Sequence, residues 1–313
     1  MLLPNLARSQ QVVRRLAIVL PDVPGPLVEP LYQLFSAELS RLGFSEGRNL
    51  FVDRHFGNSQ MSAYGELMRR AVAKSPDAIF TVGGTLSLEA KKATQTVPVV
   101  VLVADPIILK VASSLARPGS NITGVTVDGG LELYGKRLSL LLDLQSEIKR
   151  VGYLCSSRVL SRTGPALHSA AQKARVDIID IDLGDTFEDV AYAKAFAQIA
   201  DVGLDALVVS DEAEHPSHSE YLCAAAISTR LPVVFPYRSL AVAGGLMAYS
   251  VDFTELYKYA AHQVAEILRG RNPATTPFYQ PTKFQLVINT RTAQRIGLTV
   301  PPSLLLHADE VIE

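Results

Sequence analysis

The sequence predicts an α/β protein made of two consecutive, doubly wound lobes, each built on a parallel sheet. Three observations lead to this fold class. Strand and helix signals alternate almost throughout, the strands are near-continuous runs of Val, Ile and Leu, and the pattern restarts after about residue 128. Strands separated by helix-length connections run parallel, and continuous apolar strands indicate helices on both faces of the sheet. With 313 residues, 48% of them hydrophobic, the chain can bury two such cores.

The first half opens with a buried strand over 15–20 and an amphipathic helix over 29–42, which Gly43 ends. The elements expected after them are a strand over 49–53, a helix over 62–75, and strands over 78–82, 97–104 and 122–127 with helices between.

The second half begins with a helix over 135–144. Its expected strands cover 151–155, 176–181, 206–210, 232–236 and 246–250, and its expected helices lie near 165–174, 188–200, 217–229 and 239–243. A long helix over 253–268, a strand over 283–289 and a short helix over 291–296 follow. The last segment carries Leu304, Leu305 and Leu306 and is expected to dock on the fold.

Composition excludes several classes of protein. The net charge is -1 and no block of Lys and Arg follows a phosphate backbone, so nucleic acid is not an expected partner. No apolar run approaches the ~20 residues that span a bilayer. The sequence has no GxGxxG or GxxxxGK[ST] motif at its first strand, and no cofactor is expected. Cys155 and Cys223 lie in apolar stretches and are predicted to be reduced and buried, with a disulfide left open if the protein is exported.

The N-terminal segment, 1–13, has two interpretations. It lacks an apolar core and so is not a complete signal peptide, yet Ala7-Arg8-Ser9 resembles a signal peptidase site. It is either a flexible tail or the remnant of a signal peptide.

Ligands of open parallel sheets bind beyond the carboxyl ends of the strands, so the residues there are the candidate site. In the first half these are Asp22, Gly83-Gly84-Thr85 and Asp105; in the second they are Ser156, Asp211, Tyr237 and Tyr249.

The glycine pair and Asp105 each have two interpretations. Gly83-Gly84-Thr85 either lets an anion approach the backbone at the start of a helix or forms only a tight turn. Asp105 either accepts a hydrogen bond from a ligand ammonium group or only caps the turn before Pro106.

The second-half candidates are equally open. Asp211 and the adjacent Glu212 point in different directions on an extended chain, so they form no acid/base pair, but one of them could bind a ligand. The rival interpretation is a solvated loop. Tyr237 and Tyr249 either stack on a flat ligand or pack between the lobes.

Catalytic and metal signatures are weak. His215 and His218 are spaced i, i+3 and could bind a metal on a helix, but a solvated loop leading into a helix is the expected alternative. Cys155 has no partner cysteine at a matching strand end, and no GxSxG motif exists. We therefore expect no catalytic residue and no metal site.

Several stretches resemble the ABC-transporter substrate-binding proteins that include the tryptophan- and tyrosine-binding lipoproteins. The most specific are LARPGSNITG, GKRLSLL and the C-terminal PTKFQLVIN and IGLTVPPSLLLHADEVIE. The stretches VGGTLSLEAKKATQTVPVVVLVADP and AGGLMAYSVDFTELYKYAAHQVAEILRGRNPA also fit, and the resemblance covers about residues 14 to 313.

The resemblance implies a type I periplasmic-binding fold whose lobes close around a small solute. The lobes would be 14–127 plus 251–279 and 128–250 plus 280–313, with hinges near 126–135 and 249–253. The first wall of the cleft would carry Gly83-Gly84-Thr85 and Asp105, and the second wall Tyr237 and Tyr249.

The implied function is solute binding for an ABC importer rather than catalysis. The expected ligand is amino-acid-like or an aromatic carboxylate, with its carboxylate at the glycine pair and its ammonium group at Asp211 or Asp105. The expected partner is a membrane permease, the expected state is a monomer, and the expected location is periplasmic or membrane-anchored outside the cytoplasm. A ligand-sensing protein is the alternative, and a cleft enzyme is a more remote one.

Overall fold

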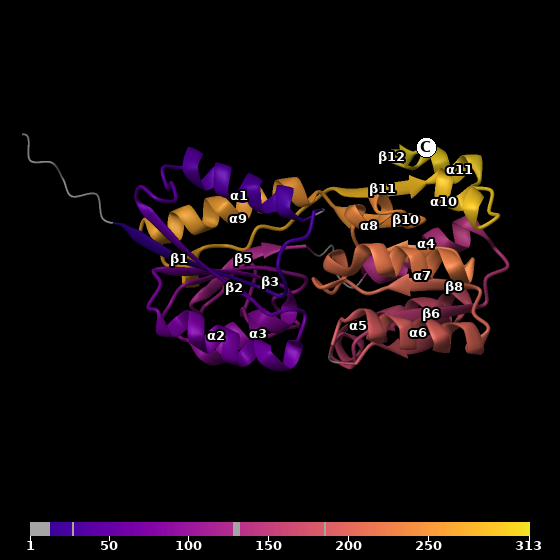
Figure 1. Ribbon diagram of the computed structural model, residues 1–313, viewed down its shortest axis with the longest axis horizontal. Helices are drawn as coiled ribbons and strands as arrows, with labels where there is room; N and C mark the ends of the chain where they lie inside the picture. Colours follow the sequence, from indigo (N-terminus) through magenta and orange to yellow (C-terminus); the bar gives the residue numbers. More distant parts are fainter. Residues whose placement is uncertain (1–12, 27, 128–131, 185) are drawn as a thin grey trace, which may run out of the picture.

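The protein consists of two α/β lobes lying side by side in this computed structural model, which describes residues 13–26, 28–127, 132–184 and 186–313 (Figure 1). The first lobe contains a five-stranded sheet in the order β2-β1-β3-β4-β5, and every pairing in it is parallel. Its strands are β1 (Arg14–Leu20), β2 (Leu50–Phe56), β3 (Ala78–Val82), β4 (Val99–Val103) and β5 (Ile122–Thr126).

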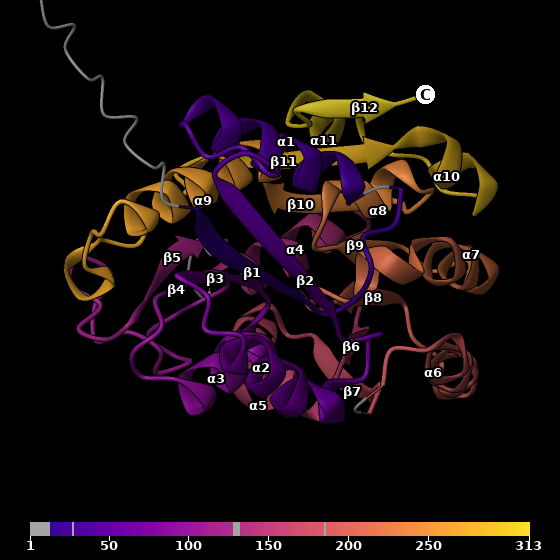
Figure 2. The same ribbon diagram turned by 60° about the vertical axis from the view of Figure 1, so that its left-hand side comes forward.

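Helices cover both faces of this sheet. On one face lie α1 (Glu29–Arg41) and α9 (Phe253–Leu268), which run beside each other although some 200 residues separate them (Figure 2). On the other lie α2 (Tyr64–Ala73) and α3 (Gly84–Ala93). Alternate β1 residues face the two layers: Leu16, Ile18 and Leu20 pack toward α1 and α9, whereas Ala17 and Val19 pack toward α2 and α3.

The second lobe contains a seven-stranded sheet in the order β12-β11-β10-β9-β8-β6-β7. Its pairings are parallel except for that between β10 and β11. The strands are β6 (Arg150–Cys155), β7 (Asp177–Asp182), β8 (Ala206–Val209), β9 (Val233–Phe235), β10 (Met247–Val251), β11 (Phe284–Asn289) and β12 (Glu310–Ile312).

Helices also cover both faces of the second sheet. One layer holds α4 (Glu132–Leu144), α5 (Ser157–Ala174), α10 (Thr290–Arg295) and α11 (Pro302–Leu306). The other holds α6 (Asp189–Val202), α7 (Ser219–Thr229) and α8 (Arg238–Val242). Three short 3₁₀ helices are η1 (Met61–Ala63), η2 (His215–His218) and η3 (Pro273–Thr275). The predicted α/β class with two largely parallel sheets is confirmed.

The chain passes between the lobes at three places in the described structure: after β5, between β10 and α9, and before β11. Tyr279 still belongs to the first lobe, because its amide donates to Gly124 at 2.9 Å and its carbonyl accepts from Thr126 at 2.8 Å. The sheet membership supports the lobes predicted from the sequence, 14–127 plus 251–279 and 128–250 plus 280–313, and we retain them as a proposal. Part of the expected hinge, 128–131, lies outside the described residues, as does 1–12 of the N-terminal segment.

Two expectations need correction. The helix placed near 165–174 begins at Ser157, because the Ser156 side chain accepts from Val159 N and caps it, and Pro165 lies inside the helix. The C-terminal tail docks only in part: Leu304 is buried, whereas Leu306 is 85% exposed. Cys155 and Cys223 are free and buried, as predicted. Across the described residues, no helix has the length and apolar content needed to cross a membrane.

Candidate functional site

A cavity of about 430 Å³ lies between the two lobes, where the carboxyl ends of β3, β4 and β8 face each other. This volume is typical of a site that encloses one small molecule. Of the nine residues predicted to bind ligand, seven line the cavity: Asp22, Gly83, Gly84, Thr85, Asp105, Asp211 and Tyr237.

The glycine pair brings the lobes into close approach. Gly83 has φ +94°, a conformation that other residues rarely adopt, and it is the N-cap of α3. A Cβ on Gly83 would lie 3.3 Å from the Cβ of Ala213 in the second lobe. A Cβ on Gly84 would lie 3.0 Å from Nη1 of Arg162, also in the second lobe. The first N–H groups of α3 have no acceptor within their own helix, and Gly84 and Thr85, at the start of α3, line the cavity.

The two first-lobe carboxylates are already used by the protein. Asp105 accepts from the amides of Ile107 at 2.7 Å and Ile108 at 3.0 Å, so it caps the turn that the sequence offered as its alternative role. Asp22 accepts from the Val23 amide at 2.8 Å and from the Ser59 hydroxyl at 2.7 Å. Both residues line the cavity, but their hydrogen bonds hold the loops in place.

The second wall contains Asp211 and Tyr237. The Tyr237 hydroxyl donates to the backbone carbonyl of Asp211 at 2.5 Å, and its ring meets that of Phe253 edge-on, with centroids 5.3 Å apart. Among the described residues, no hydrogen bond or ion pair occupies the Asp211 carboxylate, which is only partly buried and lines the cavity.

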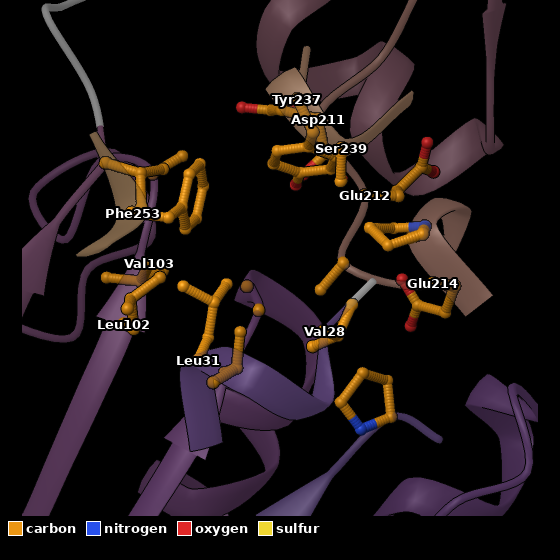
Figure 3. Close-up of a pocket in the computed structure, with 18 of the residues that line it drawn as sticks. Val28, Leu31, Leu102, Val103, Asp211, Glu212, Glu214, Tyr237, Ser239 and Phe253 are labelled. Atoms are coloured by element: carbon orange, nitrogen blue, oxygen red, sulfur yellow. The ribbon is translucent and has the colours of Figure 1, made fainter. Parts of the chain in front are cut away.

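Apolar side chains form one end of the cavity. Figure 3 shows Leu31, Leu102 and Val103 of the first lobe facing Phe253 and the ring of Tyr237 across the open space. Such a surface suits an apolar or aromatic side chain, which gains free energy when it leaves water.

Glu212 and His215 form a buried polar cluster behind the wall. Glu212 accepts from the Ser156 amide at 2.8 Å and from the Ser210 hydroxyl, and His215 Nε2 lies 3.4 Å from its carboxylate. Burial opposes ionisation of Glu212, but His215 and these donors together hold its pKa below the usual value. The expectation of a solvated loop is therefore wrong at His215, which is fully buried and also bonds to Tyr192 at 2.8 Å.

Glu214 is a site residue that the sequence did not reveal. Its carboxylate is 5% exposed and accepts from the Tyr64 hydroxyl of the first lobe at 2.6 Å. Burial, together with the negative charge of Glu212, raises the pKa of Glu214 to about 7. Only the tertiary structure brings these partners together, because 150 residues separate them.

Two predicted residues do not line the cavity. Ser156 is buried and its hydroxyl caps α5, while its amide donates to Glu212. The Tyr249 ring stacks on Phe284 of the neighbouring strand, with centroids 5.8 Å apart. A residue at a strand end points to one of two faces, and the direction of Tyr249 turns its ring away from the cleft.

The described residues contain no cluster of three or more His, Cys, Asp or Glu side chains that could hold a metal ion. Burial and nearby carboxylates raise the pKa of the Cys155 thiol, which disfavours the nucleophilic thiolate. The arrangement is suited to enclosing and orienting a small molecule.

Known proteins share this architecture along nearly the whole chain. The tyrosine-binding protein of Clostridioides difficile is 21% identical over 280 residues, which are 88% of this chain and 79% of that protein. The crystal structure of a conserved domain protein from Vibrio cholerae has a TM-score of 0.86 at 22% identity, covering 96% of this chain and 99% of that one. The ABC domain from Streptococcus pneumoniae in complex with L-Trp has a TM-score of 0.85 at 21% identity, covering 96% and 100%.

The family described as ABC transporter substrate binding protein matches residues 19–312, from the end of β1 to the last strand, and this range includes all the residues of the cavity discussed above. The chain belongs to the ABC transporter substrate-binding protein family.

Proposed function

We propose that this protein binds an amino acid zwitterion with an aromatic or large apolar side chain, and presents it to an ABC permease. The observation that carries the proposal is one carboxylate and one guanidinium in the same cavity that have no partner among the described residues. Relatives described as tyrosine-binding and as a complex with L-Trp support the ligand class.

The cavity is lined by six acidic and two basic side chains. The acids are Asp22, Asp105, Asp211, Glu212, Glu214 and Asp252, and the cations are Arg162 and Arg238. Arg238 is paired with Glu310 through two contacts of 2.6 Å, and Asp252 accepts from the Thr254 amide at 2.8 Å. The other acids except Asp211 are bonded as described above. Among the described residues, Asp211 and Arg162 alone of this set bond to no protein group.

A zwitterion complements these two charges. Its ammonium group would bind Asp211, because a hydrogen bond between an ammonium group and a carboxylate is stronger than one to a neutral acceptor. Its carboxylate would bind Arg162 together with the free amides at the start of α3, beside Gly84 and Thr85. Asp211 and Arg162 belong to the second lobe and the α3 amides to the first, so one ligand would contact both lobes, and closure would follow from its preference for the closed form.

The side chain would lie against the apolar end of the cavity, between Leu31, Val103 and Tyr237. A cavity of about 430 Å³ accommodates an amino acid as large as tryptophan together with a few waters. We propose that Asp211, Tyr237 and Gly83-Gly84-Thr85 act as ligand-binding residues and that Arg162 joins them. Ser156 and Tyr249 are withdrawn from that role.

The further assignments rest on family membership. We propose that the protein acts outside the cytoplasmic membrane, delivers its ligand unchanged rather than transforming it, and functions as a monomer. Glu212 and Glu214, the buried acids of the cavity, are bonded to His215 and Tyr64, so the proposal assigns them no acid/base role.

Isothermal titration calorimetry of the purified chain with L-tryptophan and L-tyrosine tests the proposal. We expect one site per chain. Asp211→Asn and Arg162→Gln should each weaken binding about 10- to 100-fold, the range for losing one charge-assisted hydrogen bond. The folded state should be unaffected, because neither side chain bonds to the described protein. Failure of both amino acids to bind, or recovery of a chemically altered ligand, would contradict the proposal.

Asp105→Asn provides the matched control. It removes the same charge from the same cavity, but an Asn side-chain oxygen can still accept from Ile107 and Ile108. We expect a change of less than about threefold, as for a charge that acts only through the general field. Equal losses in Asp105→Asn and Asp211→Asn would show that the ammonium group has no specific partner at Asp211.

A further inference from the structure

The lobes also meet at the rim of the cleft. This rim contact joins Ser59, Gln60 and Tyr64 of the first lobe to Thr186, Glu188, Glu214 and His218 of the second. His218 Nε2 lies 3.2 Å from the Ser59 hydroxyl, Gln60 Nε2 lies 3.4 Å from Glu188, and Gln60 forms an isolated β-bridge with Thr186.

The hydrogen bond of 2.6 Å from Tyr64 to Glu214 is the buried part of the rim contact. Tyr64 is 0% exposed and Glu214 5%, whereas Glu188 is exposed. Because the partners belong to different lobes, this bond exists only when the lobes are together. Separation of the lobes would give the Glu214 carboxylate access to water.

Water access changes the proton affinity of Glu214. In the closed form, burial and the charge of Glu212 raise its pKa to about 7 from an ordinary value of 4.5. Tyr64 acts in the opposite direction, because it donates to the carboxylate, but burial outweighs it. When the lobes separate and water reaches the carboxylate, the effect of burial disappears, so the pKa of Glu214 falls toward the ordinary value.

Other charged and titratable groups lie around Glu214 and come from several elements. Those that interact with it are Tyr64 of α2, Tyr192 of α6, Tyr237 before α8, and Glu212 and His215 of its own segment. Asp22 after β1 acts on Tyr64, and His218 lies 3.9 Å from Asp22. Of the charges that act on Glu214, Glu212 favours the neutral acid and His215 favours the carboxylate, and the effect of Glu212 is the larger.

We propose that closure of the cleft takes up one proton at Glu214, so that this protein holds its ligand more tightly as the pH falls. The part about ligand rests on the proposed function; the part about closure does not. The proton comes from solvent, converts the carboxylate to the acid on closure, and returns to solvent on opening.

The sign and range follow from linkage. Between about pH 4.5 and 7 the closed form binds more protons than the open form, so falling pH favours closure through that window. Above it the carboxylate is ionised in both forms, and below it the acid is present in both. Uptake of one proton changes affinity by at most about tenfold for each pH unit.

Calorimetric titration with L-tryptophan from pH 5 to 8, in buffers of different ionisation enthalpy, measures the protons taken up per ligand. We expect uptake in the wild type, rising to a substantial fraction of one proton near pH 6. Glu214→Gln keeps an acceptor for Tyr64 but cannot titrate, and should lose both the uptake and the pH dependence. Glu188→Gln, in the exposed part of the rim contact, should retain them.

A second measurement needs no ligand. Spin labels on Cys introduced at exposed Arg70 and Lys194, one on each lobe, report the distance between the lobes. We expect a larger closed fraction at pH 5.5 than at pH 8 in the wild type, and no difference in Glu214→Gln. This arm tests closure even if L-tryptophan does not bind, so it separates failure of the proton linkage from failure of the proposed function.

Two results would overturn the inference. The closed fraction and the affinity could be the same at both pH values in the wild type. Or the dependence could persist in Glu214→Gln, in which case its disappearance in His218→Gln would assign the proton to His218.

Discussion

The charged side chains of the cleft differ in what they have left to bind. Asp105 and Asp252 use their oxygens on backbone amides, and Arg238 uses its guanidinium on Glu310. A group that is satisfied in this way gains little from a ligand, because a new bond would replace an existing one. We therefore propose that specificity depends on Asp211 and Arg162, whose side chains bond to no other described residue of the protein.

Gly83→Ala adds one methyl group and tests whether the lobes need a glycine at this position to approach each other. The φ of +94° should cost about 1 kcal/mol of stability for any other residue. The new Cβ would also lie 3.3 Å from Ala213 in the closed form only, so ligand affinity should fall at least about threefold. Gly43→Ala is the control, since Gly43 has φ +95° with open space around it. It should lose similar stability and keep its affinity; equal affinity losses would refute the close-approach role.

Ser156→Ala tests the role of a residue that the sequence placed in the site. Its hydroxyl caps α5, so the substitution should lower the free energy of unfolding by about 1 kcal/mol, as measured by urea denaturation. The affinity for L-tryptophan should change by less than about twofold, because the hydroxyl faces the helix. A large loss of affinity at unchanged stability would restore Ser156 to the ligand site.

At the scale of elements, the return of α9 to the first lobe stabilises the fold. It packs on the sheet beside α1, and Glu38 of α1 contacts His262 of α9 at 2.7 Å and Arg41 at 2.7 Å. Aromatic rings fill the layer beneath, where Phe35 stacks on Phe80 with centroids 4.5 Å apart. The helix α9, which follows β10, therefore closes the core of a lobe that the chain had left after β5.

Glu38→Gln tests the tie between these helices. The hydrogen bonds from Arg41, with a further bond from His262, lower the pKa of Glu38 from 4.5 to about 2. A lowered pKa means that the contribution to stability is present above pH 4.5 and is lost as the pH falls through about 2. Urea unfolding at pH 7 should show the variant less stable by about 1 kcal/mol, with the difference shrinking at pH 2.5. Glu66→Gln, in an exposed pair with Arg69, should be nearly neutral at both pH values.

At the scale of the whole molecule, both lobes contribute residues to the same cavity. The cavity lining, the glycine pair and the rim contact all involve residues of both lobes, and the chain passes between the lobes three times in the described structure. A ligand that bridges the walls binds the closed form and not the unfolded chain. L-tryptophan at 100 times its dissociation constant should therefore raise the free energy of unfolding by about 2.7 kcal/mol.

Thermal denaturation and small-angle scattering check this together. We expect a higher melting temperature and a smaller radius of gyration with L-tryptophan, and neither effect with Asp211→Asn at the same concentration. A higher melting temperature without compaction would mean that binding does not require closure.

By itself, the sequence determined the fold class, the succession of strands and helices along the chain, and most of the strand ends that line the cavity. Those features are local: apolar runs, helical periodicity and glycine at a turn act over a few residues. They located Asp211, Tyr237 and the glycine pair correctly at the cleft.

Only the tertiary structure decided which of these residues face the cavity and which are already bonded. The Tyr249 ring stacks on Phe284 outside the cavity, the Ser156 hydroxyl caps α5, and the Asp105 carboxylate accepts from the Ile107 amide in its own turn. It also revealed Arg162 and the Tyr64–Glu214 bond, whose partners lie on separate lobes. The physical reason is that side-chain direction and desolvation depend on neighbours distant in sequence, which no local pattern encodes.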